Sequence, residues 1–144
     1  MTEKVIALAA DHAGYTMKNM LRDQLAEEGF EVLDLGTNAS DSVDYPDYAG
    51  LLADSILQGR AGRGVLVCGS GIGISIAANR HKGIRAALCH DETLARLSRQ
   101  HNDANVLVLG ARTTGEEVAK ACLQTFMSTE FDGGRHQKRI DKLG

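Results

Sequence analysis

Short apolar runs alternate with longer amphipathic stretches along the chain, and this alternation constrains the fold more than any other feature. Each run is rich in aliphatic residues and ends at glycine, aspartate or a polar turn, as buried strands do. The longer stretches repeat apolar residues at helical spacing, for example Met17, Leu21 and Leu25. The pattern predicts strands at residues 5–10, 32–35, 65–68, 84–89 and 106–109, and helices at residues 15–28, 48–58, 72–79, 92–100 and 114–127.

Strict alternation of five strands with five helices is typical of an α/β protein in which helices cover both faces of a parallel sheet. We therefore expect a three-layer α/β/α, Rossmann-like domain with a five-stranded parallel sheet. A length of 144 residues with 43% hydrophobic composition suits a single domain over residues 1–144. Its end, from about residue 133 to residue 144, forms a basic segment.

Charge and cysteine content exclude several classes of function. Sixteen basic and nineteen acidic residues give a net charge of -3, which provides no general field for nucleic acid or a membrane surface. The apolar run before Asp11 is too short for a signal sequence or a membrane span, so we expect a cytoplasmic protein. Three cysteines without C-x-x-C spacing indicate reduced thiols, and no histidine spacing indicates a metal site.

Polar side chains follow most of the predicted strands. Ligands of parallel sheets bind beyond the carboxyl ends of the strands, so we expect these residues to gather at one edge. His101 and Asn102, at the end of the helix before the fifth strand, are expected at the same edge. The residues that follow strands are Asp11, His12, Cys68, Gly69, Ser70, Gly71, Ile72, Gly73, His90 and Arg112.

The glycine-rich segment at residues 68–73 is the most informative of these. Glycines at alternate positions let backbone N–H groups approach an anion at a helix N-terminus, although a tight turn required for packing would look the same. The segment lacks the Lys-Ser or Lys-Thr of a nucleotide-binding P-loop, because Ile74 and Ser75 follow Gly73. It also lacks the third glycine of the dinucleotide fingerprint, which leaves dinucleotide binding a minor alternative.

Several of these residues have both a reactive and a structural interpretation. A helix N-terminus would stabilise a thiolate at Cys68, but free cysteines often only fill buried space. His101 can exchange protons near neutral pH or can end a helix, and Asp11 can act with a histidine or can cap the first helix. Arg135 and Arg139 lie four residues apart after a diglycine, a pair suited to phosphate or to a solvated basic end.

Taken together, these segments resemble the type B ribose-5-phosphate isomerases, a family that includes galactose-6-phosphate isomerase subunits and allose-6-phosphate isomerases. The resemblance covers nearly the whole chain. One branch of the family has glutamate at the position of Ile74 and lacks the cysteine, so this sequence resembles the cysteine branch. The segments that carry the resemblance are residues 11–14, 44–49, 68–79, 83–86, 98–105 and 133–136.

The resemblance implies interconversion of ribose 5-phosphate and ribulose 5-phosphate through an enediolate, without a cofactor or metal. It makes Cys68 the base, Ser70 a stabiliser of the enediolate, and His101 with Asp11 and Tyr45 the groups that open the sugar ring. It also implies a homodimer that shares its sites between subunits, with a tetramer as the alternative. The implied substrate-binding residues are His12, Tyr45, Gly69, Gly71, Ile72, Gly73, Asn102, Arg112, Arg135 and Arg139.

Two other functions stay open at the level of sequence. A six-carbon sugar phosphate, such as allose 6-phosphate or galactose 6-phosphate, would use the same residues. A nucleotide-binding module without enzymatic activity is the remoter alternative, since the fold alone does not determine function.

Overall fold

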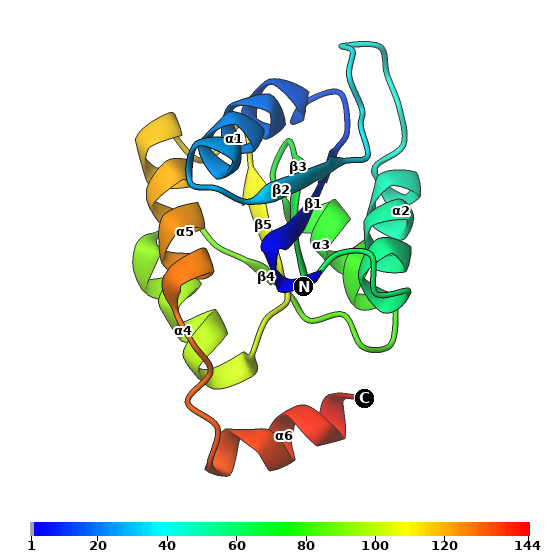
Figure 1. Ribbon diagram of the computed structural model, residues 1–144. Coiled ribbons are helices and arrows are strands. Elements are labelled where there is room, and N and C mark those ends of the chain that lie inside the picture. The colour runs from blue at the N-terminus through cyan, green and yellow to red at the C-terminus, as the bar shows by residue number, and fades with distance from the viewer. Residues whose placement is uncertain (1) are drawn as a thin grey trace.

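The computed structural model describes residues 2–144, and its centre is a sheet of five parallel strands (Figure 1). The strand order is β2-β1-β3-β5-β4, so β1 and β3 are neighbours where the chain changes its direction across the sheet. The predicted five-stranded parallel sheet is therefore confirmed. The strands are β1 Val5–Ala10, β2 Glu31–Asp34, β3 Arg63–Cys68, β4 Ala86–Leu88 and β5 Val106–Gly110.

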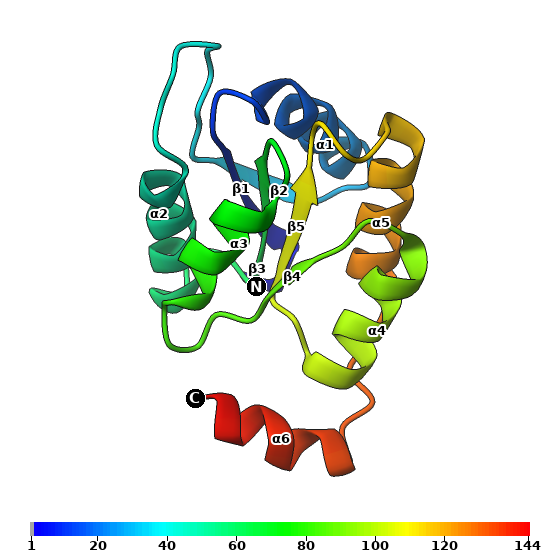
Figure 2. The same cartoon turned by 180° about the vertical axis from the view of Figure 1, so that it is seen from behind.

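Helices form a layer on each face of the sheet, as Figures 1 and 2 show from opposite sides. Helices α1, α4 and α5 cover one face, and α2 and α3 cover the other. The helices are α1 Tyr15–Glu27, α2 Tyr45–Leu57, α3 Ile72–Asn79, α4 Glu92–Asn102, α5 Glu116–Ser128 and α6 Arg135–Leu143, after a short 3-10 turn at Thr2–Lys4. Among residues 2–144, no helix has both the length and the apolar character needed to cross a membrane.

The three central strands, β1, β3 and β5, are buried on both faces, which produces two hydrophobic cores. Along β1, Ile6 and Leu8 pack in the core under α1, α4 and α5, whereas Ala7 and Ala9 pack in the core under α2 and α3. This alternation follows from the pleat of a strand, in which successive side chains point to opposite faces. Since both faces are apolar, the strands read in the sequence as continuous hydrophobic runs.

Two helices begin at different residues from those predicted. Helix α2 begins at Tyr45 instead of residue 48, because Pro46 in the first turn supplies a φ suited to a helix start. Helix α5 begins at Glu116, with Gly115 at the N-cap. The helix therefore starts two residues later than the predicted start at residue 114.

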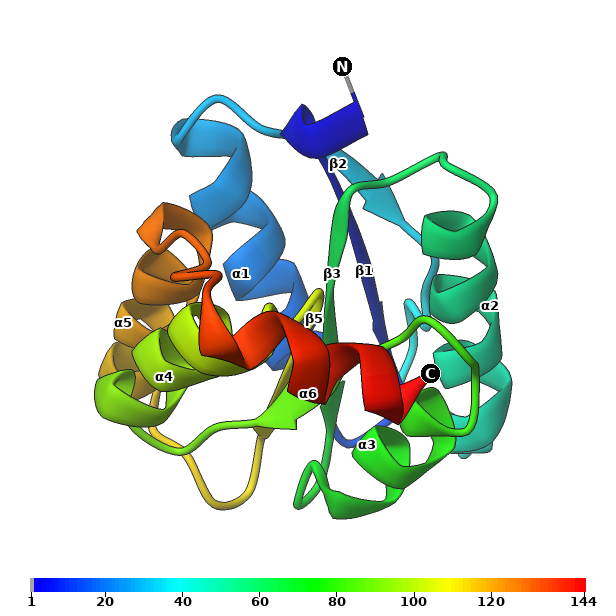
Figure 3. The same ribbon diagram turned by 90° about the horizontal axis from the view of Figure 1, so that it is seen from below.

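The helices that connect strands run antiparallel to them. Residues at the start of such a helix lie at the carboxyl edge of the sheet, and residues at its end lie at the opposite, amino edge. Helix α4 ends at the amino edge, where Asp103 takes a left-handed φ of 46° before β5 begins. Helix α5 then brings the chain back to this amino edge. Helix α6 lies across the amino edge, in front of the sheet in the view of Figure 3.

Candidate active site

The loop between β3 and α3 lies at the carboxyl edge of the sheet and holds the glycine-rich segment. Gly71 has a φ of +79°, and a Cβ at this position would lie 2.5 Å from Cδ1 of Leu88, so only glycine fits there. The N–H of Gly71 donates to Sγ of Cys68 at 3.2 Å. The N–H of Ile72 donates to Oγ of Ser70 at 3.1 Å. Backbone donors at the N-terminus of α3 therefore face a thiol and a hydroxyl group.

The three cysteines differ in their surroundings. Burial, with a smaller effect of Cys122, raises the pKa of Cys89 to about 12. Burial, together with nearby acidic groups, raises the pKa of Cys122 to about 11, so both side chains stay protonated at neutral pH. Cys68 differs from both of these residues because its Sγ accepts the N–H of Gly71 at the N-terminus of α3.

The loop after β1 lies next to this segment. The carboxylate of Asp11 is buried and accepts the N–H groups of Ala13 and Gly14, at 3.0 and 3.1 Å. A Cβ at Gly14 would lie 2.5 Å from the carbonyl oxygen of Val67, so the start of α1 packs directly on the end of β3. Asp11 thus shapes the turn before α1, but the N-cap of this helix is Gly14, so the interpretation of Asp11 as the cap of the first helix is wrong.

Three more of the predicted residues lie at the same edge. Nδ1 of His12 accepts the N–H of Val43 at 3.2 Å, which connects the loop after β1 to the loop before α2. A Cβ on Gly73 would lie 2.6 Å from Cζ of Tyr45, so this ring packs against the first turn of α3. The guanidinium of Arg112 lies over the glycine loop, with Nη1 3.2 Å from the position of a Cβ on Gly69.

The remaining predicted residues lie at the opposite edge of the sheet. His101 and Asn102 form the end of α4, and Arg135 and Arg139 belong to α6. The expectation that all polar groups gather at one edge is wrong, because α4 runs back from the carboxyl edge to the amino edge. One chain therefore holds two separate groups of candidate residues. Asn102 also borders a hollow of about 470 Å³ between β4 and the end of α6.

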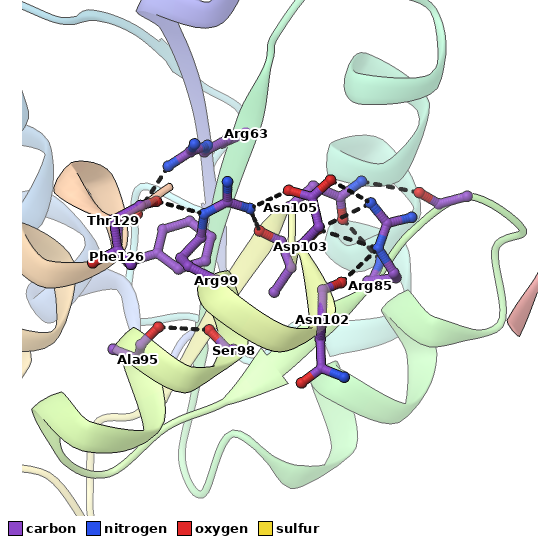
Figure 4. A network of polar contacts seen from close by, with 12 residues as sticks. Arg63, Arg85, Ala95, Ser98, Arg99, Asn102, Asp103, Asn105, Phe126 and Thr129 are labelled. Atoms are coloured by element: carbon purple, nitrogen blue, oxygen red, sulfur yellow. Dashed lines mark hydrogen bonds and ion pairs between the residues drawn. The ribbon is translucent and has the colours of Figure 1, made fainter. Parts of the chain in front are cut away.

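A polar network holds the end of α4 in place (Figure 4). The buried guanidinium of Arg99 donates to the carboxylate of Asp103 and to the carbonyl of Ala104, both at 2.7 Å. Nε of Arg85 donates to the carbonyl of Asn102 at 3.0 Å. Bonds from two arginines thus hold the turn that follows His101, which limits the positions that the imidazole can reach.

The structure also places two residues beside His101 that sequence reasoning missed. The rings of His101 and His136 stack at 4.4 Å between centroids, with 15° between their planes. Partial desolvation, followed by the positive charges of His101, Arg135 and Arg139, lowers the pKa of His136. Ligand atoms of His101, His136 and Asp132 lie within 4.8 Å of one another. The four-residue spacing of Asp132 and His136 was the only local signal, and nothing in the sequence connects that pair to His101.

Comparisons with known proteins find similar sequences and similar folds. Ribose-5-phosphate isomerase B of Escherichia coli is 45% identical over 140 residues, which cover 97% of this chain and 94% of the relative. The crystal structure of a ribose 5-phosphate isomerase from Thermotoga maritima is 52% identical and covers 96% of both chains, with a TM-score of 0.95. Ribose-5-phosphate isomerase B of Mycoplasma genitalium with bound ribulose-5-phosphate is 42% identical, with a TM-score of 0.92, and covers 96% of this chain and 93% of that one.

The chain also matches a known protein family over most of its length. The sequence pattern of this family, described as Ribose/Galactose Isomerase, matches residues 6–143. The match includes the glycine-rich loop, the end of α4 and all of α6. The chain therefore belongs to the ribose/galactose isomerase family.

Proposed function

We propose that this chain is an aldose-ketose isomerase that interconverts ribose 5-phosphate and ribulose 5-phosphate. The observation that carries this proposal is the geometry at Cys68, where a thiol at the end of β3 accepts a backbone N–H from the N-terminus of α3. Such a site can hold a base next to donors for a developing oxyanion. The names of the relatives from E. coli and T. maritima support the choice of substrate.

In the proposed reaction, the thiolate of Cys68 removes the proton from C2 of the open-chain aldose. The electrons of that bond form a C1–C2 double bond, and the aldehyde oxygen becomes the enediolate oxygen. Ser70 and the N–H groups of residues 71–73 stabilise this charge, although the N–H of Gly71 is shared with Cys68. The cysteine then returns the proton to C1, while the proton of the C2 hydroxyl passes to the oxygen at C1, so that C2 becomes the ketone and C1 carries a hydroxyl group.

Opening of the furanose ring is assigned to His101, with Asp11 and Tyr45 assisting. His101 and Cys68 lie at opposite edges of one chain, so we propose that the site forms between two copies. Helix α3 offers a surface for this pairing, because Ile72 and Ile76 lie one turn apart and are 54% and 52% exposed. Large exposed apolar side chains in such an arrangement are typical of a protein interface.

The phosphate is assigned to Arg135 and Arg139 of one copy, with His12 and Arg112 of the other. The two arginines lie four residues apart on α6, so their guanidinium groups can reach one anion from the same helix face. Asn102 would contact the sugar hydroxyls. Among the residues of this proposal, none is required to bind a metal or an organic cofactor.

The reaction is tested by converting ribose 5-phosphate to ribulose 5-phosphate with protein treated with a chelator. We expect activity that persists without metal and that falls by about 100-fold or more in Cys68→Ala. A wild-type chain that is inactive on this substrate would exclude the proposed reaction. If Cys68→Ala is as active as the wild type, the proposed reaction stands but Cys68 is excluded as its base.

The shared site is tested by mixing two inactive variants, Cys68→Ala and His101→Asn, after dissociation and reassociation. Random pairing makes half of the dimers mixed, and each mixed dimer has one intact site of two, so about a quarter of the wild-type activity should return. Each variant reassociated alone is the control and should stay inactive. If each chain carried a complete site of its own, mixing would restore no activity.

A six-carbon sugar phosphate is the second candidate, because the description of the family includes galactose as well as ribose. The values of kcat/KM for ribose 5-phosphate, allose 6-phosphate and galactose 6-phosphate separate the candidates. A higher value for either hexose phosphate would replace our first choice. The residues assigned above would keep their roles.

A further inference from the structure

Three side chains of ligand type meet at the amino edge of the sheet. They are His101 at the end of α4, Asp132 in the linker to α6, and His136 in the first turn of α6, and their ligand atoms lie within 4.8 Å of one another. Two imidazoles and one carboxylate are a donor set that zinc enzymes use, with a fourth position left open. The proposed isomerase reaction uses only His101 of this set.

Two hydrogen bonds connect the linker that carries Asp132 to helix α4. The N–H of Asp132 donates to the carbonyl of Gln100 at 3.0 Å, which fixes the linker to the last turn of α4. Nε of Arg99 donates to the carbonyl of Thr129 at 3.1 Å, which fixes the start of the linker to the same helix. These bonds therefore hold Asp132 close to the end of α4 without help from an ion.

The side chains have room to adjust to a metal. A tetrahedral ion with bonds of about 2.0–2.1 Å needs ligand atoms about 3.3 Å apart, so the cluster must contract by at most about 1.5 Å. His101 and His136 are half-buried and Asp132 is exposed. Rotation of the two stacked rings about their terminal torsions would turn ring nitrogens toward a common point, since these torsions are broad.

The charges around the cluster select among cations. Arg135 and Arg139 are on the same helix as His136, so a hard ion that binds through charge alone, such as Mg²⁺, is disfavoured here. Zn²⁺ gains more from imidazole nitrogens, and the carboxylate of Asp132 supplies a negative charge. The arginines would also favour an anion in the open position of the metal.

We propose that His101, Asp132 and His136 form a Zn²⁺-binding site, and that Zn²⁺ bound there inhibits the isomerase. Coordination would occupy the lone pair of His101 that proton transfer to and from the sugar requires, and the ion would compete with the substrate for the same space. The binding site follows from the cluster alone. The inhibition rests on the function proposed above for His101.

Binding is tested by calorimetric titration of Zn²⁺ into the full chain carrying Cys68→Ala, so that this thiol cannot contribute. We expect saturation at one ion per chain, and weaker binding by at least about tenfold when Asp132→Asn is added. The matched control is Glu130→Gln, which removes a charge from the same linker and should leave the affinity unchanged. An absence of saturable binding, or equal affinities in these two variants, would overturn the site.

Cobalt(II) gives a second measurement that requires no change to the cluster. Co²⁺ bound to nitrogen and oxygen ligands should absorb in the visible range without the near-ultraviolet charge-transfer band of a thiolate. A thiolate band in the Cys68→Ala chain would assign the ion to another cysteine and overturn the site. Mg²⁺ at the same concentration should not displace Co²⁺.

Inhibition is tested with the chain that retains Cys68. Zn²⁺ should inhibit isomerisation, and Asp132→Asn should raise the half-inhibitory concentration by the factor seen in binding while activity without zinc stays within about twofold. Equal half-inhibitory concentrations of Zn²⁺ for Asp132→Asn and Glu130→Gln would contradict competition between Zn²⁺ and the substrate at this cluster. If the chain has no isomerase activity at all, the proposed function fails, but the titration still decides the metal site.

Discussion

At the scale of single residues, the three cysteines show how surroundings decide the use of one side chain. All three are buried, yet only the sulfur of Cys68 faces a helix N-terminus in the described part of the chain. Cys89 and Cys122 lie in the core under α4 and α5, where burial raises their pKa values. The thiol at the carboxyl edge is therefore expected to react, and the two core thiols are expected to be inert.

We predict that iodoacetamide modifies one thiol per native chain and that this modification abolishes isomerase activity. Cys68→Ala should lower kcat by about 100-fold to 10,000-fold, because it removes the proposed base. Mass spectrometry of the alkylated protein identifies the modified residue. Cys89→Ala is the matched control and should keep the activity per folded chain; rapid alkylation of Cys89 in native protein would contradict the assignment.

At the scale of elements, a few buried polar contacts fix the positions of loops. The amine of Lys18 is fully buried on α1 and donates to Asp34 at 2.7 and 2.9 Å, and to Oδ1 of Asn38 at 3.0 Å. This ion pair joins α1 to the end of β2 and to the loop that leads toward α2. A buried charge that is paired in this way specifies one arrangement of the three segments.

We predict that part of the stability of this protein is lost in acid because of Asp34. Burial alone would raise the pKa of Asp34, but the hydrogen bonds and the charge of Lys18, with Gly36 and Arg22, lower it below 3.8. A lowered pKa in the folded state stabilises the fold above pH 3.8, and this contribution is lost as the pH falls through the lowered value. Urea unfolding at neutral pH and at about pH 3 should show a smaller difference between wild type and Asp34→Asn in acid. An unchanged difference would contradict the pKa shift.

The glycine loop allows a matched pair of substitutions. Gly71→Ala should destabilise the fold by about 2 kcal/mol or more, because it combines a positive φ with a Cβ 2.5 Å from Leu88. Gly50→Ala, within α2, should stabilise by about 0.5–1 kcal/mol, since open space surrounds the new Cβ among the described residues. The free energy of unfolding in urea measures both. Equal effects would show that the conformation of Gly71 is not what requires glycine.

At the scale of the whole molecule, one chain presents two half-sites at opposite edges of its sheet. In the function proposed above, the end of β3 and the N-terminus of α3 would supply the base and the oxyanion donors, and the end of α4 and α6 would supply a histidine and the arginines. Apolar residues on the outer face of α3 lie close to the first half-site. If two copies pair through this face, catalysis would depend on assembly, because each active site would combine half-sites from two copies.

We predict that Ile76→Glu yields a folded but monomeric chain without isomerase activity. Ile76 is 52% exposed in a single chain, so the substitution costs the monomer little, whereas a charge in an apolar interface opposes pairing. Sedimentation velocity measures the assembly, and circular dichroism checks the fold. Val118→Glu on α5, where Val118 is 41% exposed, is the control and should stay paired and active. A dimeric, active Ile76→Glu would exclude α3 as the interface.

The sequence by itself determined the class of this fold and the place of half of its candidate site. Buried strands appear in the sequence as short continuous apolar runs, whereas amphipathic helices repeat apolar residues at helical spacing. Because of this difference, all five strands and the helices between them could be predicted with small errors at their ends. Residues that follow a strand directly, such as Cys68 and Asp11, could be placed because a parallel sheet sends every such loop to one edge.

Only the tertiary structure decided where the second half of the site lies. The length and direction of α4 carry His101 to the amino edge. The path of the linker brings Asp132 and His136, which are 31 and 35 residues further along the chain, beside it. Contacts of this kind depend on packing between elements distant in the sequence, which local periodicity does not encode. The strand order β2-β1-β3-β5-β4 was hidden for the same reason, because apolar strands of similar composition can pair in more than one order until their helices pack against them.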